Sequence, residues 1–234
     1  MNGVEGQESS LAAVAHELKT PLVLMRQLSF ELENCSDASR RQEIIQRMRL
    51  TTERSLRLAD NLSKISRLDG AMFELEPIQT SGLINEVIDE LSPLSRYLKQ
   101  EIIIKSSKKP LVALGNRELL FSLLIGLLDN ALRCSENHNP ILITTQTKNQ
   151  ESILSVRDNG PTIDLAQYRK LSSSLGQQSM PISARPHSSG LGLIVASRLA
   201  TAMNGRLSIS RHHAGGMTFA VHLPISVQLS LLRI

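Results

Sequence analysis

The hydrophobic positions in the first part of the chain recur with helical spacing. Within residues 8–34, apolar side chains follow one another every seven residues: Leu11, Leu18, Met25 and Leu32. This period is typical of an amphipathic helix with a coiled-coil-like seam. The segment 34–39 interrupts the pattern, and Asp37 or Ser39 is expected to cap a second helix over 40–68. A lone hairpin leaves its seam half buried, so we expect a homodimer in which two hairpins form a four-helix bundle.

The pattern changes after Asp69-Gly70, where strands and helices begin to alternate irregularly. Strands are predicted at 73–78, 101–105, 141–148, 152–158, 206–210 and 217–224. Helices are predicted at 80–96, 116–135 and 189–205. The polar, Ser-rich stretch 161–189 is expected to form a lid. Without regular β-α-β alternation, the pattern predicts an α+β sandwich with a mixed sheet covered by helices. The predicted domains are 1–70 and 71–234.

Composition excludes several classes of function. The chain has 234 residues, a net charge of +4 and only 3% aromatic residues. No Lys/Arg run is dense enough, and too few aromatic rings are present, to indicate nucleic-acid binding. The two cysteines, Cys35 and Cys134, lie far apart and predict neither a disulfide framework nor a metal site. No apolar run is long enough to span a bilayer, so we expect a cytoplasmic protein or the soluble part of a longer one.

The stretch AHELKTPL (15–22) places reactive side chains on the first predicted helix. His16 and Thr20 are four positions apart and therefore share one helix face. Pro21 has no N–H, so the carbonyl of Glu17 loses its helical partner and the turn is expected to bend and expose the imidazole. A neutral imidazole nitrogen is a nucleophile, and a neighbouring carboxylate can hold the proton on its other nitrogen. A surface histidine beside an ordinary proline kink is the alternative.

Three further motifs follow along the chain. In LLDNALRCS (127–135), Asn130 lies mid-helix, where its amide oxygen can ligate Mg²⁺, and Arg133 is a candidate for a phosphate contact. In VRDNGPT (156–162), Asp158 at a strand end suits a carboxylate that accepts from an exocyclic amine, although an ordinary turn has the same composition. In SSGLGL (188–193), two glycines let backbone N–H groups approach phosphate at a helix N-terminus.

The order of these motifs is more specific than any one of them. A histidine box, an asparagine box, an Asp-x-Gly loop, a lid-like stretch and a Gly-x-Gly helix together resemble the catalytic core of bacterial two-component sensor histidine kinases. The resemblance covers essentially the whole chain. It implies a dimerisation and histidine-phosphotransfer hairpin over 1–70. It also implies, over 71–234, an ATP-binding domain of the type shared with DNA gyrase B and the heat-shock chaperone ATPases.

The resemblance assigns a role to each motif. His16 is the implied phosphoacceptor, Glu17 assists its proton, and Thr20 helps to place water for hydrolysis of a phosphorylated partner. Asn130 is the implied Mg²⁺-ATP residue, and Asp158 reads the adenine amine. The remaining residues implied to bind the nucleotide are Arg133, Gly160, Gly190, Leu191 and Gly192. The implied reaction is autophosphorylation of the histidine and transfer to an aspartate of a response-regulator receiver domain.

Several positions depart from the family pattern, and most of them cluster around the nucleotide. Gly126 stands where a first asparagine is usual, Cys134 replaces an aromatic residue, and Thr162 and Ser188 replace glycines. The usual Phe-containing box is not recognisable unless Tyr168 substitutes for it. Two alternatives therefore stay open. One is a degenerate core that acts mainly as a response-regulator phosphatase or docking scaffold. The other is an ATP-driven clamp of the gyrase and chaperone type.

Overall fold

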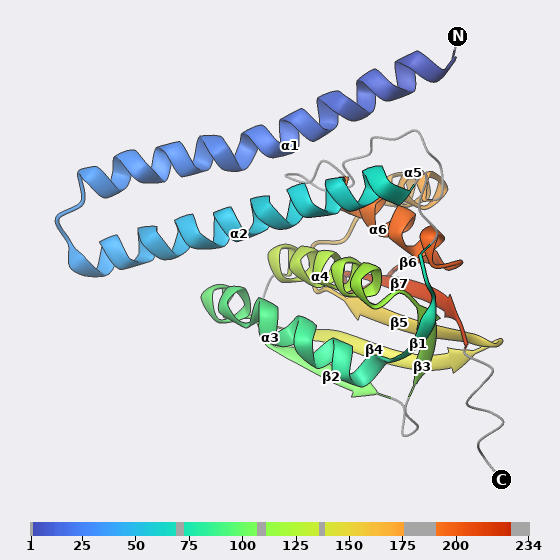
Figure 1. The fold of residues 1–234 in the computed structure, drawn as a ribbon. Helices are drawn as coiled ribbons and strands as arrows, with labels where there is room; N and C mark the ends of the chain where they lie inside the picture. The colour runs from blue at the N-terminus through green and yellow to red at the C-terminus, as the bar shows by residue number, and fades with distance from the viewer. Residues whose placement is uncertain (1, 69–72, 107–110, 136–138, 176–190, 226–234) are drawn as a thin grey trace.

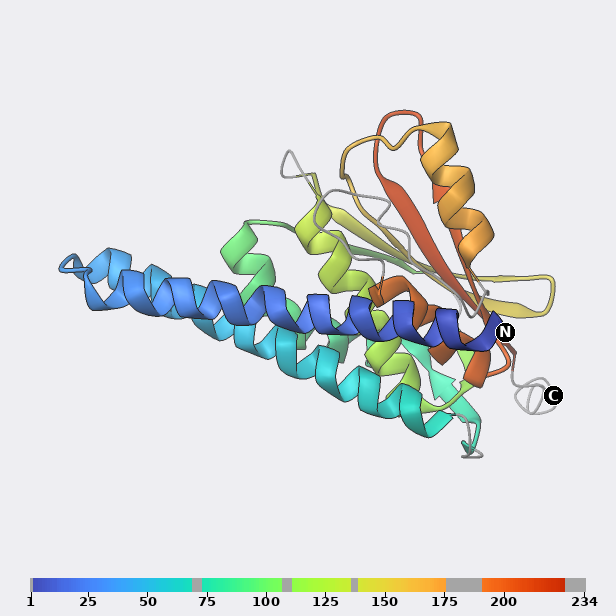
Figure 2. The same cartoon turned by 90° about the horizontal axis from the view of Figure 1, so that it is seen from above.

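Two long helices form an antiparallel hairpin that lies against a layered α+β body, here called the sandwich (Figure 1). The computed structural model describes residues 2–68, 73–106, 111–135, 139–175 and 191–225. The hairpin consists of α1 (Asn2–Glu33) and α2 (Ala38–Leu68), and its closed end projects beyond the sandwich (Figures 1 and 2). The predicted hairpin is therefore confirmed.

Local chemistry sets the ends and the inner face of the hairpin. The Asp37 carboxylate accepts a hydrogen bond from the backbone N–H of Arg40 at 2.6 Å, so Asp37 is the N-cap of α2. Leu28 and Ile44 are almost completely buried within the hairpin. Pro21 lies inside α1, and the helix continues through it. Apolar side chains of both helices thus lie on the inner face of the hairpin.

The sandwich contains a mixed five-stranded sheet in the order β2-β4-β5-β7-β6. The parallel pair is β2 (Ile102–Ser106) with β4 (Ile141–Lys148), and all other neighbours are antiparallel. The other strands are β5 (Glu151–Arg157), β6 (Arg206–Arg211) and β7 (Met217–Pro224). A separate two-stranded sheet pairs β1 (Glu76–Gln79) with β3 (Val112–Gly115). The predicted mixed sheet is confirmed.

Helices cover one face of the five-stranded sheet, and α4 lies in the middle of this layer (Figure 1). The layer consists of α3 (Thr80–Leu98), α4 (Arg117–Cys134) and α6 (Leu191–Ala202). Asn116 caps α4 by accepting from the backbone N–H of Leu119 at 3.1 Å. Buried side chains occur on nearly every side of α4, which is typical of a helix enclosed by other elements. The hairpin lies across the outside of this layer (Figure 2).

Three details differ from the sequence prediction. The strand expected from residue 73 begins only at Glu76, and the short strand β3 was not predicted. The stretch expected to be a polar lid contains a helix, α5 (Leu165–Ser174), capped by the Asp164 carboxylate. Its inward side chains are Leu171, which is buried, and Tyr168, whose hydroxyl donates to the Ile209 carbonyl at 3.2 Å. These contacts attach α5 to β6, while 176–190 lies outside the described residues.

The apolar seam of α2 is covered differently from what we expected. Leu58, Leu62 and Ile65 pack against the core of the sandwich. A second set of large apolar side chains on the hairpin is exposed: Leu22, Val23, Phe30, Ile45 and Leu56. The hairpin therefore has one apolar face covered by its own chain and another that faces solvent. The four-helix bundle stays a prediction, and the exposed set is the surface available for it.

Gly205 connects α6 to β6 at a point of close backbone approach. A Cβ at this position would meet the His222 carbonyl oxygen at 2.4 Å and Leu223 at 2.7 Å. We expect Gly205→Ala to lower the free energy of unfolding by about 1–3 kcal/mol, because the backbone must shift. Gly126→Ala is the control, since no atom lies within 4 Å of its added Cβ, and it should stabilise α4 by roughly 0.5–1 kcal/mol. Urea unfolding measures the change in the free energy of unfolding for each variant. Equal changes in the two variants would contradict the packing argument.

Candidate functional site

The structure places Asn130 on α4 directly beside Gly192 on α6. A Cβ added to Gly192 would meet the Asn130 side-chain amide nitrogen at 3.2 Å and its oxygen at 3.9 Å. A side chain at residue 192 would therefore press on the Asn130 amide. Gly192 is exposed and Asn130 is half-buried, so the amide lies at an accessible edge between the two helices. The asparagine motif and the Gly-x-Gly motif, 62 positions apart in the numbering, are thus brought together.

Asp158 lies directly after β5 and is 1% exposed. Its Oδ1 accepts hydrogen bonds from the backbone N–H groups of Gly160 at 2.9 Å and Met217 at 3.1 Å. Its own backbone N–H donates to the Met217 carbonyl at 2.9 Å. These bonds hold the carboxylate in one orientation and attach the Asp-x-Gly loop to the start of β7. Such a fixed, buried carboxylate is suited to recognising a hydrogen-bond donor on a ligand.

Glycine is required where β7 approaches this loop. Gly216 has a φ of +78°, and a Cβ there would meet the Asp158 carbonyl oxygen at 2.2 Å. The Gly216 N–H also donates to the Gly160 carbonyl at 2.8 Å. Both the left-handed backbone and the close approach exclude a side chain. The Gly215-Gly216 pair is therefore part of the site, although no motif in the sequence marked it.

A hydrogen bond links the end of α4 to the Asp158 loop. The backbone N–H of Asn159 donates to the Ser135 hydroxyl at 3.1 Å, and the Asn159 side chain donates to the Pro140 carbonyl at 2.7 Å. Ser135 is the C-cap residue of α4. The helix that carries Asn130 is therefore tied to the loop that carries Asp158. These contacts were not predicted, because Ser135 and Asn159 are ordinary turn residues in the sequence.

The histidine motif lies on α1, as the periodicity predicted. Within it, Glu17 is half-buried and Thr20 is exposed. The side chain of His16, the side chain of Leu191 and the whole of Gly190 lie outside the described part of the chain. Their roles stay predictions.

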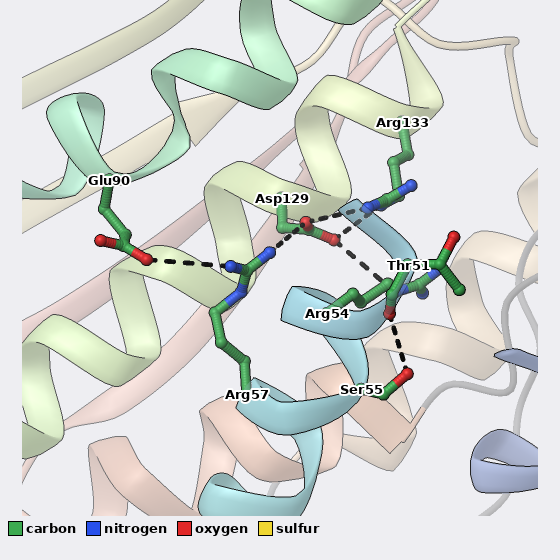
Figure 3. A network of polar contacts seen from close by, with 7 residues as sticks. All are labelled: Thr51, Arg54, Ser55, Arg57, Glu90, Asp129 and Arg133. Atoms are coloured by element: carbon green, nitrogen blue, oxygen red, sulfur yellow. Dashed lines mark hydrogen bonds and ion pairs between the residues drawn. The ribbon is translucent and has the colours of Figure 1, made fainter. Parts of the chain in front are cut away.

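Arg133 has a defined partner within its own helix. Its Nε donates to the Asp129 carboxylate at 2.9 Å and its guanidinium makes a second contact at 3.4 Å. Asp129 in turn faces α2 (Figure 3). The structure therefore groups Arg133 with the hairpin contact. A phosphate contact of Arg133 stays a prediction.

The described residues contain neither a metal-binding cluster nor a membrane-spanning helix. No group of three or more His, Cys, Asp or Glu side chains that could hold a metal ion occurs within that part of the chain. In the same part, no helix has both the length and the apolar character needed to cross a bilayer.

Comparison with known proteins agrees with this arrangement. Residues 115–227 match the family described as histidine kinase-, DNA gyrase B-, and HSP90-like ATPase. The sensor protein SphS of Synechococcus elongatus is 30% identical over 222 residues, which cover 90% of this chain and 53% of that protein. The chain spans about half the length of the curated relatives it matches.

Two solved structures have the same overall fold. Histidine kinase ThkA in complex with response regulator protein TrrA superposes with a TM-score of 0.63 at 19% identity, over 93% of this chain and 61% of that one. ShkA in complex with AMPPNP superposes with a TM-score of 0.60 at 24% identity, over 93% and 46%. Residues 115–227 therefore belong to this ATPase family. A helical hairpin followed by this sandwich is the fold of histidine kinase cores, and over 90% of its length the chain is similar in sequence to a sensor protein.

His212 lies in the turn that presents the two glycines to the Asp158 loop. Its backbone N–H donates to the Gly216 carbonyl at 3.2 Å, and its Nε2 lies 2.7 Å from the Thr218 hydroxyl. Burial lowers the pKa of His212, and the nearby charge of Arg157 lowers it further. The folded protein therefore binds a proton at His212 less readily than the unfolded chain does.

This pKa direction predicts a pH dependence of stability. Because the folded-state pKa lies below the usual value of 6.5, the contribution of neutral His212 is present above that value and is lost as pH falls through the folded-state pKa. We expect the free energy of unfolding to decrease between pH 7 and pH 5, and His212→Gln to flatten this part of the profile. Urea titrations at several pH values measure it. The control is His213→Gln, at the exposed neighbouring residue. An equal flattening of the stability profile by this variant would contradict the assignment to His212.

Proposed function

We propose that this chain binds ATP, transfers the γ-phosphoryl group to His16, and passes it to an aspartate of a response regulator. The observation that carries the proposal is the convergence of Asn130, Gly192 and the Asp158 loop in a sandwich whose preceding hairpin carries the stretch AHELKTPL. The matched ATPase family supports the nucleotide, and the AMPPNP complex of ShkA supports it further. The ThkA–TrrA complex supports a response-regulator partner.

The proposed nucleotide site uses residues from three elements. Asp158 would accept from the exocyclic amine of adenine, with Gly160 leaving room for the base. Asn130 would supply an amide oxygen to Mg²⁺, and the lack of a side chain at Gly192 leaves room for that amide. Gly190 and Leu191 would add backbone N–H groups at the start of α6. Mg²⁺, when bound, neutralises charge on the phosphate oxygens.

The proposed chemistry at the hairpin requires little beyond positioning. A nitrogen of the His16 imidazole attacks the γ-phosphorus in line, the bond to the bridging oxygen breaks, and ADP leaves. Glu17 would hold the proton on the other ring nitrogen and so keep the attacking nitrogen neutral. Thr20, four positions further along α1 on the same face, would orient water when the phosphorylated regulator is hydrolysed.

The proposed assembly is a homodimer through the hairpin, with 1–70 as the dimerisation and phosphotransfer domain and 71–234 as the ATP-binding domain. The exposed set of apolar side chains on α1 and α2 supports this, because side chains such as Leu22 and Leu56 are 66% and 61% exposed. Large apolar side chains left exposed on a helical surface are candidates for an interface.

The test of the acceptor is His16→Gln. We expect the wild-type protein incubated with γ-labelled ATP to acquire an acid-labile, base-stable label, and the variant to acquire none. Nucleotide affinity should be nearly unchanged, because residue 16 lies on the hairpin and Asp158 in the sandwich. Label retained by His16→Gln would place the acceptor elsewhere. A wild-type protein that binds nucleotide but is never labelled would instead favour the phosphatase or scaffold alternative.

The test of the nucleotide pocket is Gly126→Asn. Residues 126 and 130 share a face of α4, and no atom lies within 4 Å of a Cβ added at Gly126. An added amide beside Asn130 should tighten Mg²⁺-ATP and raise the autophosphorylation rate about tenfold, equivalent to about 1.4 kcal/mol in the barrier. The measurement compares thermal stability with and without Mg²⁺-ATP, and Gly126→Ala supplies the helix effect alone. No difference between the two variants would show that the native pocket is already complete.

A further inference from the structure

A cluster of charged side chains joins the hairpin to the sandwich (Figure 3). Here it is called the Arg–Asp cluster, and its members are Arg54, Arg57, Glu90, Asp129 and Arg133. The Asp129 carboxylate, 9% exposed, lies 3.4 Å from the Arg57 guanidinium and 3.8 Å from that of Arg54. Arg57 also lies 3.9 Å from Glu90 on α3. One nearly buried carboxylate of α4 is thus shared by two arginines of α2.

A second polar contact repeats this pattern along the same two helices. The Lys64 ammonium donates to the Ser122 hydroxyl at 2.7 Å and lies 3.0 Å from the Glu118 carboxylate. On α2 the step from Arg57 to Lys64 is seven residues, and on α4 the step from Asp129 to Ser122 is also seven. Matched seven-residue steps on two antiparallel helices keep both contacts on one line. The polar contact is therefore a repeated feature of the helix pair.

Asp129 keeps a partner whether or not the hairpin is in place. Arg133 lies four positions along the same helix and donates to Asp129 at 2.9 Å. Loss of both α2 arginines would leave the carboxylate paired and newly exposed to water. The large penalty that follows from an unpaired buried charge is then avoided. This arrangement suits a contact that forms and separates repeatedly.

The residue that contacts the hairpin is the neighbour of the residue that faces the nucleotide site. Asp129 faces α2, while Asn130 faces Gly192 on α6. Successive residues of a helix point about 100° apart, so the two side chains serve two different neighbours. The orientation of α4 against α2 therefore fixes the direction of Asn130 relative to the hairpin that carries His16.

We propose that Arg54 and Arg57 are positioning residues that clasp the ATP-binding domain to the hairpin through Asp129, and that the clasp opens and closes. This inference deepens the proposed function, because the movement has a purpose only if the chain transfers phosphate from ATP to His16. When the clasp is closed, the site at Asn130 has one orientation relative to the hairpin. When it opens, Arg133 alone neutralises Asp129. The apolar contacts between α2 and the sandwich must then separate as well.

The experiment measures the distance between the two parts in the full chain. One spin label is placed on native Cys35 at the hairpin end. A second is placed on Ser210→Cys, at an exposed position of β6. Cys134→Ser removes the other native thiol. Double electron–electron resonance then gives the populations of closed and open arrangements. Arg57→Ala should shift the closed-to-open ratio about tenfold toward open, between the effects typical of exposed and of buried ion pairs. Added salt should open the native protein more than the variant.

A matched control separates the clasp from general loss of an arginine. Arg49 lies on the same helix, and its ion pair with Glu53 at 2.9 Å does not involve the sandwich. Arg49→Ala should leave the distance distribution unchanged. A double-mutant cycle of Arg57→Ala with Asp129→Asn should show the two effects to be coupled. Equal behaviour of Arg57→Ala and Arg49→Ala, or additive effects in the cycle, would overturn the proposal.

Binding of a fluorescent ATP analogue to the same variants distinguishes the two levels of inference. Arg57→Ala should bind it with affinity within about twofold of the native protein, because the arginine does not contact the site. If no variant, including the native protein, binds the analogue, the proposed function fails while the distance result still decides the clasp. If all bind it and the distances do not respond, the clasp alone is wrong.

Discussion

The enclosure of α4 is the constraint on which the rest of the structure depends. A helix with buried side chains on nearly every side must be covered by other elements. Here the sheet, α3, α6 and α2 surround it. The hydrophobic effect thereby brings α6 close enough for Gly192 to meet Asn130, and brings α2 close enough for its arginines to meet Asp129. The candidate site and the hairpin contact are both consequences of covering one helix.

Periodicity predicted the long elements and failed on the short ones. The two hairpin helices, α3, α4, α6 and the β4–β5 pair were all expected from their spacing. The strand β3 has four residues, too few for a period to be recognised, and α5 turns only Tyr168 and Leu171 inward within a Ser-rich stretch. The sandwich covers Leu58, Leu62 and Ile65 of α2. Hydrophobic spacing does not distinguish this partner from a second hairpin, because both present apolar surfaces.

The candidate site was predictable where one residue type has a restricted chemical use. Asn130, Asp158 and Gly192 stood out because a mid-helix amide, an acid at a strand end and a glycine at a helix start each need an explanation. Ser135 and Gly216 did not, since their roles arise from contacts between segments distant in sequence. Arg133 was predicted to contact phosphate because it is a cation near the asparagine motif. In the structure its partner is Asp129 on the same helix.

The different directions of Asp129 and Asn130 restrict how the length of α4 can change during evolution. Inserting or deleting one residue between Ser122 and Asn130 would rotate everything beyond it by about 100°. Asp129 would then turn away from α2, and the amide at 130 would leave Gly192. Substitutions at the exposed positions of this helix can accumulate one at a time, but an insertion or deletion there disrupts both contacts in a single event. The segment from 122 to 130 should therefore keep a constant length among descendants of this protein even where its sequence diverges.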